Sequence, residues 1–234
     1  LMPVGECGQW GTVDVGGQVR LRYHHEQGMG QRAGRTRFQD TTNDFMLSRL
    51  RLYTNWQIND WARFYAEGIH AGVTSNQAYV PRGIDENNGD LTNFFFDAKA
   101  TDSLTVRLGR QELLYGAQRT VSPLDWANTR RTFEGVNALY RNGDLAVDAF
   151  YTNVVPVSAN QFDEADYDRS FYGFYSVYKG FCDATVDVYY LGYDDERPTA
   201  DFSIHTIGAR VNGNVGEWLY ELEGAPQFGR QSAL

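Results

Sequence analysis

Residues 45–56 read FMLSRLRLYTNW, and they decide the fold class because apolar and polar side chains alternate along them. The even positions are mostly apolar: Met46, Leu50, Leu52 and Trp56. The odd positions are mostly polar: Arg49, Arg51, Tyr53 and Asn55. A helix would place Arg49 and Leu52 on one face, so a period of 3.6 fits badly. A period of two predicts a β-strand with one apolar and one polar face.

The same alternation recurs in residues 144–151 and 183–190. Aromatic residues make up 15% of the chain, which has 24 Gly and 6 Pro, and its mean hydropathy is −0.50. This composition favours strands, and the absence of an apolar run of roughly 18 residues excludes a helical membrane protein. We expect about eleven strands, at residues 13–26, 43–57, 61–73, 91–100, 103–110, 132–142, 144–153, 170–179, 183–193, 203–212 and 216–225.

Short and long connections alternate between these strands. The short ones carry turn residues: Asn59-Asp60, Thr101-Asp102, Asn142-Gly143, Gly180 and Gly213-Asn214. The Asn-Gly pair is a type I′ hairpin signal. The long connections are 27–42, 74–90, 111–131, 154–169 and 194–202. Outer-membrane barrels have tight turns at one end and long loops at the other, whereas soluble sandwiches and jelly rolls, the alternative, do not segregate loop lengths so regularly.

We therefore predict an all-β fold, an antiparallel up-and-down transmembrane β-barrel of the outer-membrane type, as a single domain over residues 1–234. Aromatic residues next to the short turns fit an interfacial girdle: Trp56, Trp61, Tyr140, Tyr178 and Trp218. An odd strand count does not close a bacterial barrel, and residues 231–234 lack a terminal aromatic. We expect an N-terminal part of a larger barrel, truncated at its C-terminus and without a signal peptide, that forms an open, curved sheet.

Residues 108–136, LGRQELLYGAQRTVSPLDWANTRRTFEGV, resemble the alginate export family of outer-membrane porins. The resemblance extends to RLRL at 49–52 and WARFYAE at 61–67. It implies a monomeric barrel of about eighteen strands, within the range known for such barrels, that passes a polyanionic uronate polymer from the periplasm to the exterior. Its motifs cover most of residues 43–153, and the remainder matches by pattern alone.

Strand parity assigns charged side chains to the lumen, because a lipid-facing Arg or Lys near the membrane midplane costs about 2–4 kcal/mol. The candidate substrate path on the strands comprises Arg49, Arg51, Arg63, Glu67, Asp97, Lys99 and Arg107. A carboxylated polymer needs surplus fixed donors, and the acidic members would hold the arginines in place. The alternative, which is compatible with this role, is that inward charges pair and fill the lumen with salt bridges.

The connection 111–131 adds Arg119, Arg130 and Arg131 to the candidate path. Ser122, Pro123 and Asp125 resemble a helix start, so we expect a short helix at 123–130. We expect the loop to fold into the barrel, because Leu124 and Trp126 would otherwise be exposed; packing on the outer rim is the alternative. Arg110 breaks the parity by pointing outward, and a bulge or a position at the rim would explain it.

Acidic runs fall in long loops and explain most of the net charge of −9: 85–86, 163–168 and 194–196. We expect these loops to be solvated; a weaker hypothesis is divalent-cation bridging to lipopolysaccharide. The acidic balance argues against a nucleic-acid partner.

Cys7 and Cys182 lack metal-site spacing and are as consistent with a disulfide as with two free thiols. The four His show no nucleophile–base arrangement, so we expect no enzyme, no cofactor and no metal.

The favoured function is an outer-membrane porin that passes an anionic polysaccharide or small anions through an Arg/Lys-lined lumen. Expected partners are outer-membrane lipid, lipopolysaccharide and periplasmic export machinery. A general diffusion porin for small solutes is the first alternative, and single-channel ion selectivity would separate the two. A soluble carbohydrate-binding β-domain is the second, and solubility without detergent would support it.

Overall fold

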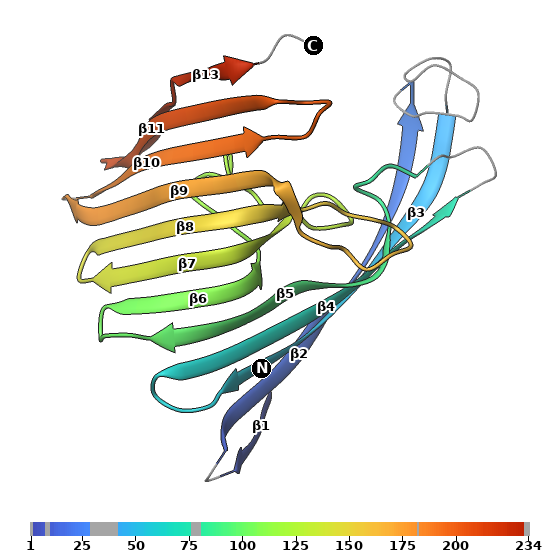
Figure 1. Cartoon of the computed structure of the whole chain (residues 1–234), viewed down its shortest axis with the longest axis horizontal. Coiled ribbons are helices and arrows are strands. Elements are labelled where there is room, and N and C mark those ends of the chain that lie inside the picture. The colour runs from blue at the N-terminus through green and yellow to red at the C-terminus, as the bar shows by residue number, and fades with distance from the viewer. Residues whose placement is uncertain (1, 8–9, 29–41, 76–80, 182, 232–234) are drawn as a thin grey trace.

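The computed structural model describes residues 2–7, 10–28, 42–75, 81–181 and 183–231. They form strands joined into one antiparallel sheet (Figure 1). The strands are β1 (Met2–Cys7), β2 (Gly11–Gln27), β3 (Thr42–Gln57), β4 (Ala62–Ser75), β5 (Asn87–Lys99), β6 (Leu104–Gln111), β7 (Thr132–Asn142), β8 (Leu145–Val155), β9 (Asp166–Phe181), β10 (Ala184–Asp195), β11 (Phe202–Val215), β12 (Trp218–Gly224) and β13 (Gln227–Gln231). Each of the predicted strands is confirmed. The fold is all-β, and the described residues contain no helix.

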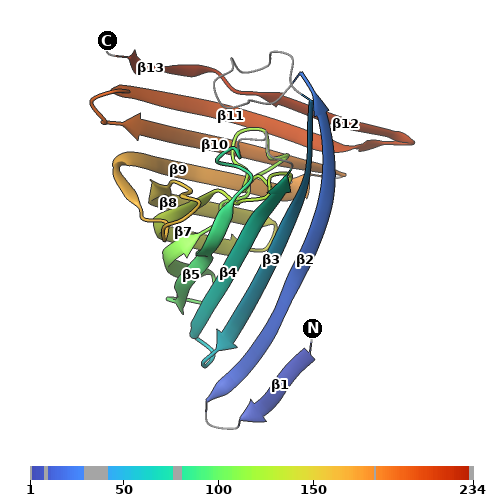
Figure 2. The same cartoon turned by 90° about the vertical axis from the view of Figure 1, so that its right-hand side faces the viewer.

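Neighbours in sequence are neighbours in the sheet, in the order β1 to β12, and β13 pairs with β11. The described strands at the two ends of this order, β1 and β12, do not pair with each other. The sheet is strongly curved and twisted, with a concave face that encloses the long connection after β6 (Figure 2). The predicted open, curved, up-and-down sheet is therefore confirmed, and it is consistent with an incomplete barrel.

Two strands escaped the sequence prediction. Residues 2–7 of β1 include Pro3 and Gly5, which weaken a strand pattern. Strand β13 follows Pro226, and it continues along β11 the pairing that β12 begins. Because proline has no N–H for the ladder, the edge strand breaks there, although Ile207 N still donates to Pro226 O at 3.2 Å.

The turn between β7 and β8 differs in type from the prediction. Asn142 pairs with Leu145, so Gly143 and Asp144 are the two loop residues. Gly143 has a φ of 55°, and Asp144 is not among the described residues with positive φ. A positive φ at the first loop position alone is typical of type II′ rather than the predicted type I′.

Strands β3 and β4 pair as a hairpin across the predicted short turn at Asn59-Asp60, and Arg51 pairs with Ile69 and Tyr53 with Glu67. The exposed fractions of Leu52 and Arg49 are 59% and 1%, so the two faces separate as expected. Cross-strand partners share a face, and the pairing Trp56–Phe64 and Thr54–Ala66 places Phe64 and Ala66 on the face of Leu52. Arg63 and Glu67 lie on the opposite face, which confirms the assignment made from parity.

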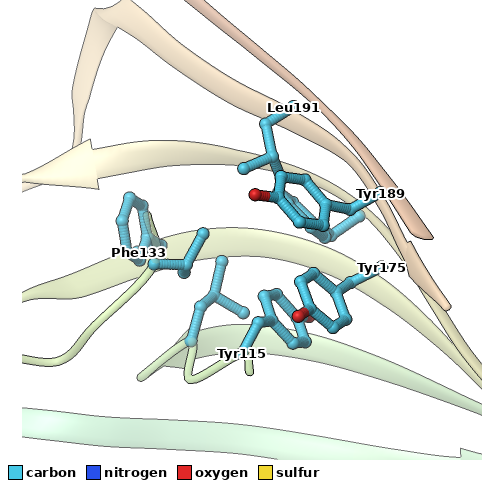
Figure 3. Packing of buried hydrophobic residues seen from close by; sticks show 8 residues of the cluster. Tyr115, Phe133, Tyr175, Tyr189 and Leu191 are labelled. Carbon is cyan, nitrogen blue, oxygen red and sulfur yellow. The ribbon is translucent and has the colours of Figure 1, made fainter. Parts of the chain in front are cut away.

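The concave face departs from the general pattern near the long-loop end of β3. Phe45 and Leu47 lie on this face and are buried; the Phe45 ring stacks on His24 at a centroid distance of 5.0 Å, and the Arg82 guanidinium lies 5.7 Å from its centroid. The connection 112–131 reaches the neighbouring backbone, where Asn128 donates to Ser48 O at 3.0 Å. Further along the sheet, Tyr115 stacks between Phe150 and Tyr175 at centroid distances of 5.7 and 4.8 Å (Figure 3).

Candidate functional site

The inward-facing side chains of β2–β6, which we call the charged half of the concave face, carry rows of arginine and carboxylate. Asp97 lies between Arg63 and Arg107, its partners on the two adjacent strands. Arg63 Nη1 is 3.0 Å from Asp97 Oδ2, and Arg107 Nε is 2.7 Å from Asp97 Oδ1. The Arg107 guanidinium also lies 3.8 Å above the Phe95 ring. Two guanidiniums thus share one carboxylate, which leaves a nominal charge of +1.

A second group centres on Arg51. Arg51 Nε donates to Glu67 Oε1 at 2.9 Å, and its Nη2 lies 3.3 Å from Glu112 Oε1. The Thr92 hydroxyl donates to the same Glu67 oxygen at 2.7 Å. Glu67 is buried, and its burial is tolerable because each contact satisfies part of the carboxylate.

Residues 112–131, which we call the inner loop, complete this group from the concave side. Arg49 Nη2 is 3.0 Å from Asp125 Oδ1, and Arg130 Nε is 2.6 Å from Glu112 Oε1. Arg130 also pairs with Asp125. The network therefore contains three guanidiniums and three carboxylates, and it is nominally neutral: Arg49, Arg51 and Arg130 with Glu67, Glu112 and Asp125.

Two arginines of β2 hold the backbone of the inner loop. Arg20 Nη1 donates to Asp125 O and Arg22 Nη1 to Trp126 O, each at 2.6 Å. Within the described residues, neither guanidinium forms an ion pair with a carboxylate. Carbonyl groups satisfy their N–H donors without cancelling the charge, so Arg20 and Arg22 add surplus positive charge to the charged half.

These contacts confirm the expected inward fold of the loop, but the expected helix at 123–130 is wrong. The segment is made of turns, and Leu124 has a φ of 59°. The Ser122 hydroxyl accepts from Leu124 N at 3.1 Å, as a helix cap would. Leu124 O then accepts from Ala127 N in a single turn, and the carbonyls of residues 125–127 accept from arginine side chains instead of from helical amides. The inward fold also leaves Trp126 61% exposed, so shelter of this ring does not explain it.

The structure brings together most of the predicted path residues but not all. Lys99 lies at a short turn, exposed, with its Nζ 3.0 Å from Asp102 Oδ1. Arg119 reaches β12, where Nη1 is 2.6 Å from Glu223 Oε2, and it also pairs with Glu221. Arg131 is exposed and lines a separate hollow. These three residues lie outside the two networks of the charged half.

The inward side chains of β7–β11 form an aromatic half instead. Tyr175 stacks on Tyr115 and on Tyr189, at centroid distances of 4.8 and 5.1 Å. Its hydroxyl donates to Asp187 Oδ2 at 2.7 Å, and Arg210 Nη1 lies 2.8 Å from the same oxygen. Charge in this half is thus confined to a few paired groups beneath a stack of rings.

At the long-loop end of β6, Arg110 is buried and not exposed to lipid. Its Nη1 is 2.9 Å from Asp90 Oδ1 and its Nη2 is 3.2 Å from Glu134 Oε2. The pairing of β6 with both neighbours is continuous from Thr105 to Arg110. A bulge therefore does not explain the parity break, and the position at the strand end does.

The expectation of solvated acidic loops is wrong for several carboxylates. Asp85 is buried, and its Oδ2 lies 2.9 Å from Arg82 Nε. Asp195 is buried against Arg197 at 2.6 Å. Asp163 is buried as well, and this burial raises the pKa of its carboxyl to about 6 although Ser158 N and Asn87 donate to it.

Sequence reasoning missed the roles of Arg20, Arg22, Glu112 and Asp125. The inward direction of Arg20 and Arg22 could have been predicted, because residues 18–24 alternate polar and apolar types as β3 does. The structure agrees with this alternation, since Leu21 is 70% exposed on the other face. Glu112 and Asp125 lie in an irregular loop, where no periodicity reports side-chain direction. The aromatic girdle positions have the expected exposure at Trp61 and Trp218, 57% and 81%.

Other predicted features add no site. The described residues contain no group of three or more His, Cys, Asp or Glu that could hold a metal ion. Residue Cys182 and the side chain of Cys7 lie outside what the structure describes, so the two alternatives, a disulfide and two free thiols, both stand as predictions. Among the described residues no helix is long and apolar enough to cross a membrane.

Comparison with known families gives one match: the model of the alginate export family covers residues 12–233. A search of curated proteins gives no match.

Proposed function

The chain belongs to the alginate export family, and we propose that its charged half lines a path for an anionic polysaccharide or a related anionic solute. The family consists of transporters and is not a class of enzyme, and its membership together with the all-β sheet fits an outer-membrane β-barrel. The observation that carries the proposal is the surplus of guanidinium groups on the concave face.

The surplus follows from the contacts. The network around Arg51 balances, but Arg63 and Arg107 share the single carboxylate of Asp97. Arg20 and Arg22 bind backbone carbonyls. The Asp14 carboxylate lies on the same face of β2 and accepts from Tyr53 Oη at 3.4 Å, so it offsets one of these charges. A narrow path with low-dielectric walls magnifies such fixed charge, so these four arginines support selection of anions.

The convex face of the sheet supports the proposal that the protein lies in a membrane. Side chains on it are apolar and exposed, among them Val19 at 72%, Leu52 at 59% and Leu108 at 54%. A soluble protein rarely exposes so continuous an apolar surface, whereas the lipid-facing band of a barrel is built of such residues. We propose outer-membrane lipid and lipopolysaccharide as the surroundings of this face.

The inner loop suggests how the path is narrowed. Residues Asp125, Trp126 and Ala127 present their carbonyls to β2 and β3, so the loop crosses the charged half. A constriction at this level would bring a passing carboxylate close to Arg20 and Arg22, where a charge-assisted hydrogen bond is strongest.

The Arg51 network has as many carboxylates as guanidiniums, and this neutrality favours a second candidate function, a general diffusion porin for small solutes. Paired charges give a polar, wettable wall without a strong preference for one sign of ion. A porin of this kind would conduct potassium and chloride about equally, whereas the surplus of the charged half supports a preference for chloride.

Block of the ionic current by sugars tests the proposal. The intact protein in a planar bilayer would be exposed to oligouronates and to neutral oligosaccharides of the same length. We expect oligouronates to block the current and the neutral oligomers to do so much less, and Arg20→Gln with Arg22→Gln to weaken the block on the order of tenfold. Lys179→Gln, which removes an exposed charge next to a short turn, is the matched control. Equal block by charged and neutral oligomers would contradict the proposal.

A further inference from the structure

A hollow of about 550 Å³ lies between the inner loop and strands β7–β11 and β13, apart from the charged half. Its size is that of a small-molecule site. One wall is apolar, with Phe133, Phe171, Leu191 and Ile204 among its residues, and Phe133 and Leu191 belong to the buried cluster of the aromatic half (Figure 3). The ring centroids of Phe133 and Phe171 are 5.2 Å apart, so this wall is already packed.

Three arginines also line the hollow. They are Arg119, Arg131 and Arg169, and no Asp or Glu is among its described lining residues. Arg119 is engaged by Glu223 at 2.6 Å, and Arg169 Nε by an Asp166 oxygen at 2.7 Å. The Arg131 side chain is exposed, and it has no ion pair within the described part of the chain. Among the residues that the structure describes, the hollow therefore combines one uncompensated guanidinium with an apolar surface.

We infer that this hollow binds a small aromatic monocarboxylate, with the carboxylate on Arg131 and the ring against Phe171 and Leu191. The planar guanidinium offers a carboxylate two parallel N–H donors. The ring gains from burial against aromatic and aliphatic carbons. This inference rests on the proposed function only in that the solute would enter the hollow from the lumen.

A uronate sugar fits the hollow less well than an aromatic acid. Its ring carries several hydroxyl groups, and those turned toward Phe171, Leu191 and Ile204 would lose water without gaining a hydrogen bond. Buried polar groups without a partner cost binding free energy. Thr120, Ser122 and Thr206 offer hydroxyls, and Gln227 an amide, on part of the lining, but the apolar wall offers a sugar no hydrogen-bond partner. The hollow would thus select a different anion from the polymer proposed for the charged half.

Equilibrium binding to the intact protein in detergent tests the inference, with benzoate, benzyl alcohol and glucuronate as probes in isothermal titration calorimetry. We expect benzoate to bind on the order of tenfold more tightly than either the neutral alcohol or the sugar acid. Arg131→Gln should weaken benzoate by a similar factor and leave benzyl alcohol unchanged. Ile204→Asn should weaken benzoate and benzyl alcohol alike, and Lys179→Gln should change neither.

Two outcomes would overturn the inference: glucuronate binding as tightly as benzoate, or benzoate binding that Arg131→Gln leaves intact. Unchanged circular dichroism and thermal unfolding establish that each variant folds, which is expected because Arg131 and Ile204 are exposed. Calorimetry measures binding to the hollow and not ionic current. A pore that fails to select anions and a hollow that fails to bind benzoate are therefore distinguishable results.

Discussion

The two halves of the concave face are stabilised by different forces. In the charged half, Arg51, Glu67 and their partners satisfy one another across strands and with the inner loop. In the aromatic half, Tyr115, Tyr175 and Tyr189 stack and leave little room for charge. The same alternation along the strands thus produces two different surfaces. It determines which side chains face inward, but not whether those side chains form ion pairs or stacked rings. Ion pairs leave part of one half charged, whereas ring packing anchors the loop on the other.

The largest loss of stability is expected in the aromatic half. Tyr175→Ala removes the central ring of the stack and leaves Asp187 with one donor fewer. We expect a loss of about 3–5 kcal/mol in the free energy of unfolding, as for other buried aromatic truncations. Urea unfolding of the intact protein in detergent measures it. Tyr151→Ala, which removes a ring 55% exposed on the outer face, is the control and should cost far less; equal losses would show that the stack is not a core.

Loss of Arg130 in the charged half should lower stability more locally, in the inner loop. Arg130→Met leaves Glu112 and Asp125 partly unpaired near the β3 arginines, and breaking a buried pair costs about 3 kcal/mol or more. We expect faster amide hydrogen exchange throughout residues 112–131. Arg119→Met removes an arginine of the same loop whose pairs are more exposed, so it should change the exchange of this loop much less. Equal exchange in the two variants would show that the buried pairs of Arg130 hold the inner loop no more firmly than the exposed pairs of Arg119 do.

A pH effect is expected at the rim, outside both halves. Burial raises the pKa of Asp163 to about 6 from 3.8, so the protonated carboxyl is favoured in the folded loop. Its neighbours are Asp90, paired with Arg110, and the donors Asn87 and Ser158. Local stability of residues 156–165 should fall as the pH rises from about 4 to 6, by on the order of 1 kcal/mol. Hydrogen exchange at both pH values measures this, and Asp163→Asn should abolish the dependence; a loop that becomes more stable with rising pH would contradict it.

The smallest effect belongs to Lys99, a predicted path residue that the structure places at a short turn. Its partner Asp102 is fully exposed, and such pairs contribute about 1 kcal/mol or less. Lys99→Ala should leave both the unfolding free energy and the ion selectivity nearly unchanged. A large change in reversal potential would mean that the path extends to this turn.

The strands were predictable because each alternates over enough residues to fix its period. Residues 43–57 match Thr42–Gln57, and residues 132–142 match β7. Parity also placed Arg49, Arg51 and Glu67 on one face. It could not supply Glu112 or Asp125, because the direction of an irregular loop depends on contacts with distant strands. For the same reason the helix predicted at 123–130 gave way to turns whose carbonyls bind Arg20 and Arg22.

The reversal potential in asymmetric KCl tests most directly whether surplus guanidinium in the charged half selects anions. The intact protein in a planar bilayer should prefer chloride, more strongly at low salt than at about 0.1 M, where screening shortens the field to about 10 Å. Arg51→Ser with Arg107→Ser leaves carboxylates of both networks with fewer partners, so the preference for chloride should fall. A wild-type pore that prefers potassium, or a double variant with an unchanged reversal potential, would contradict this assignment.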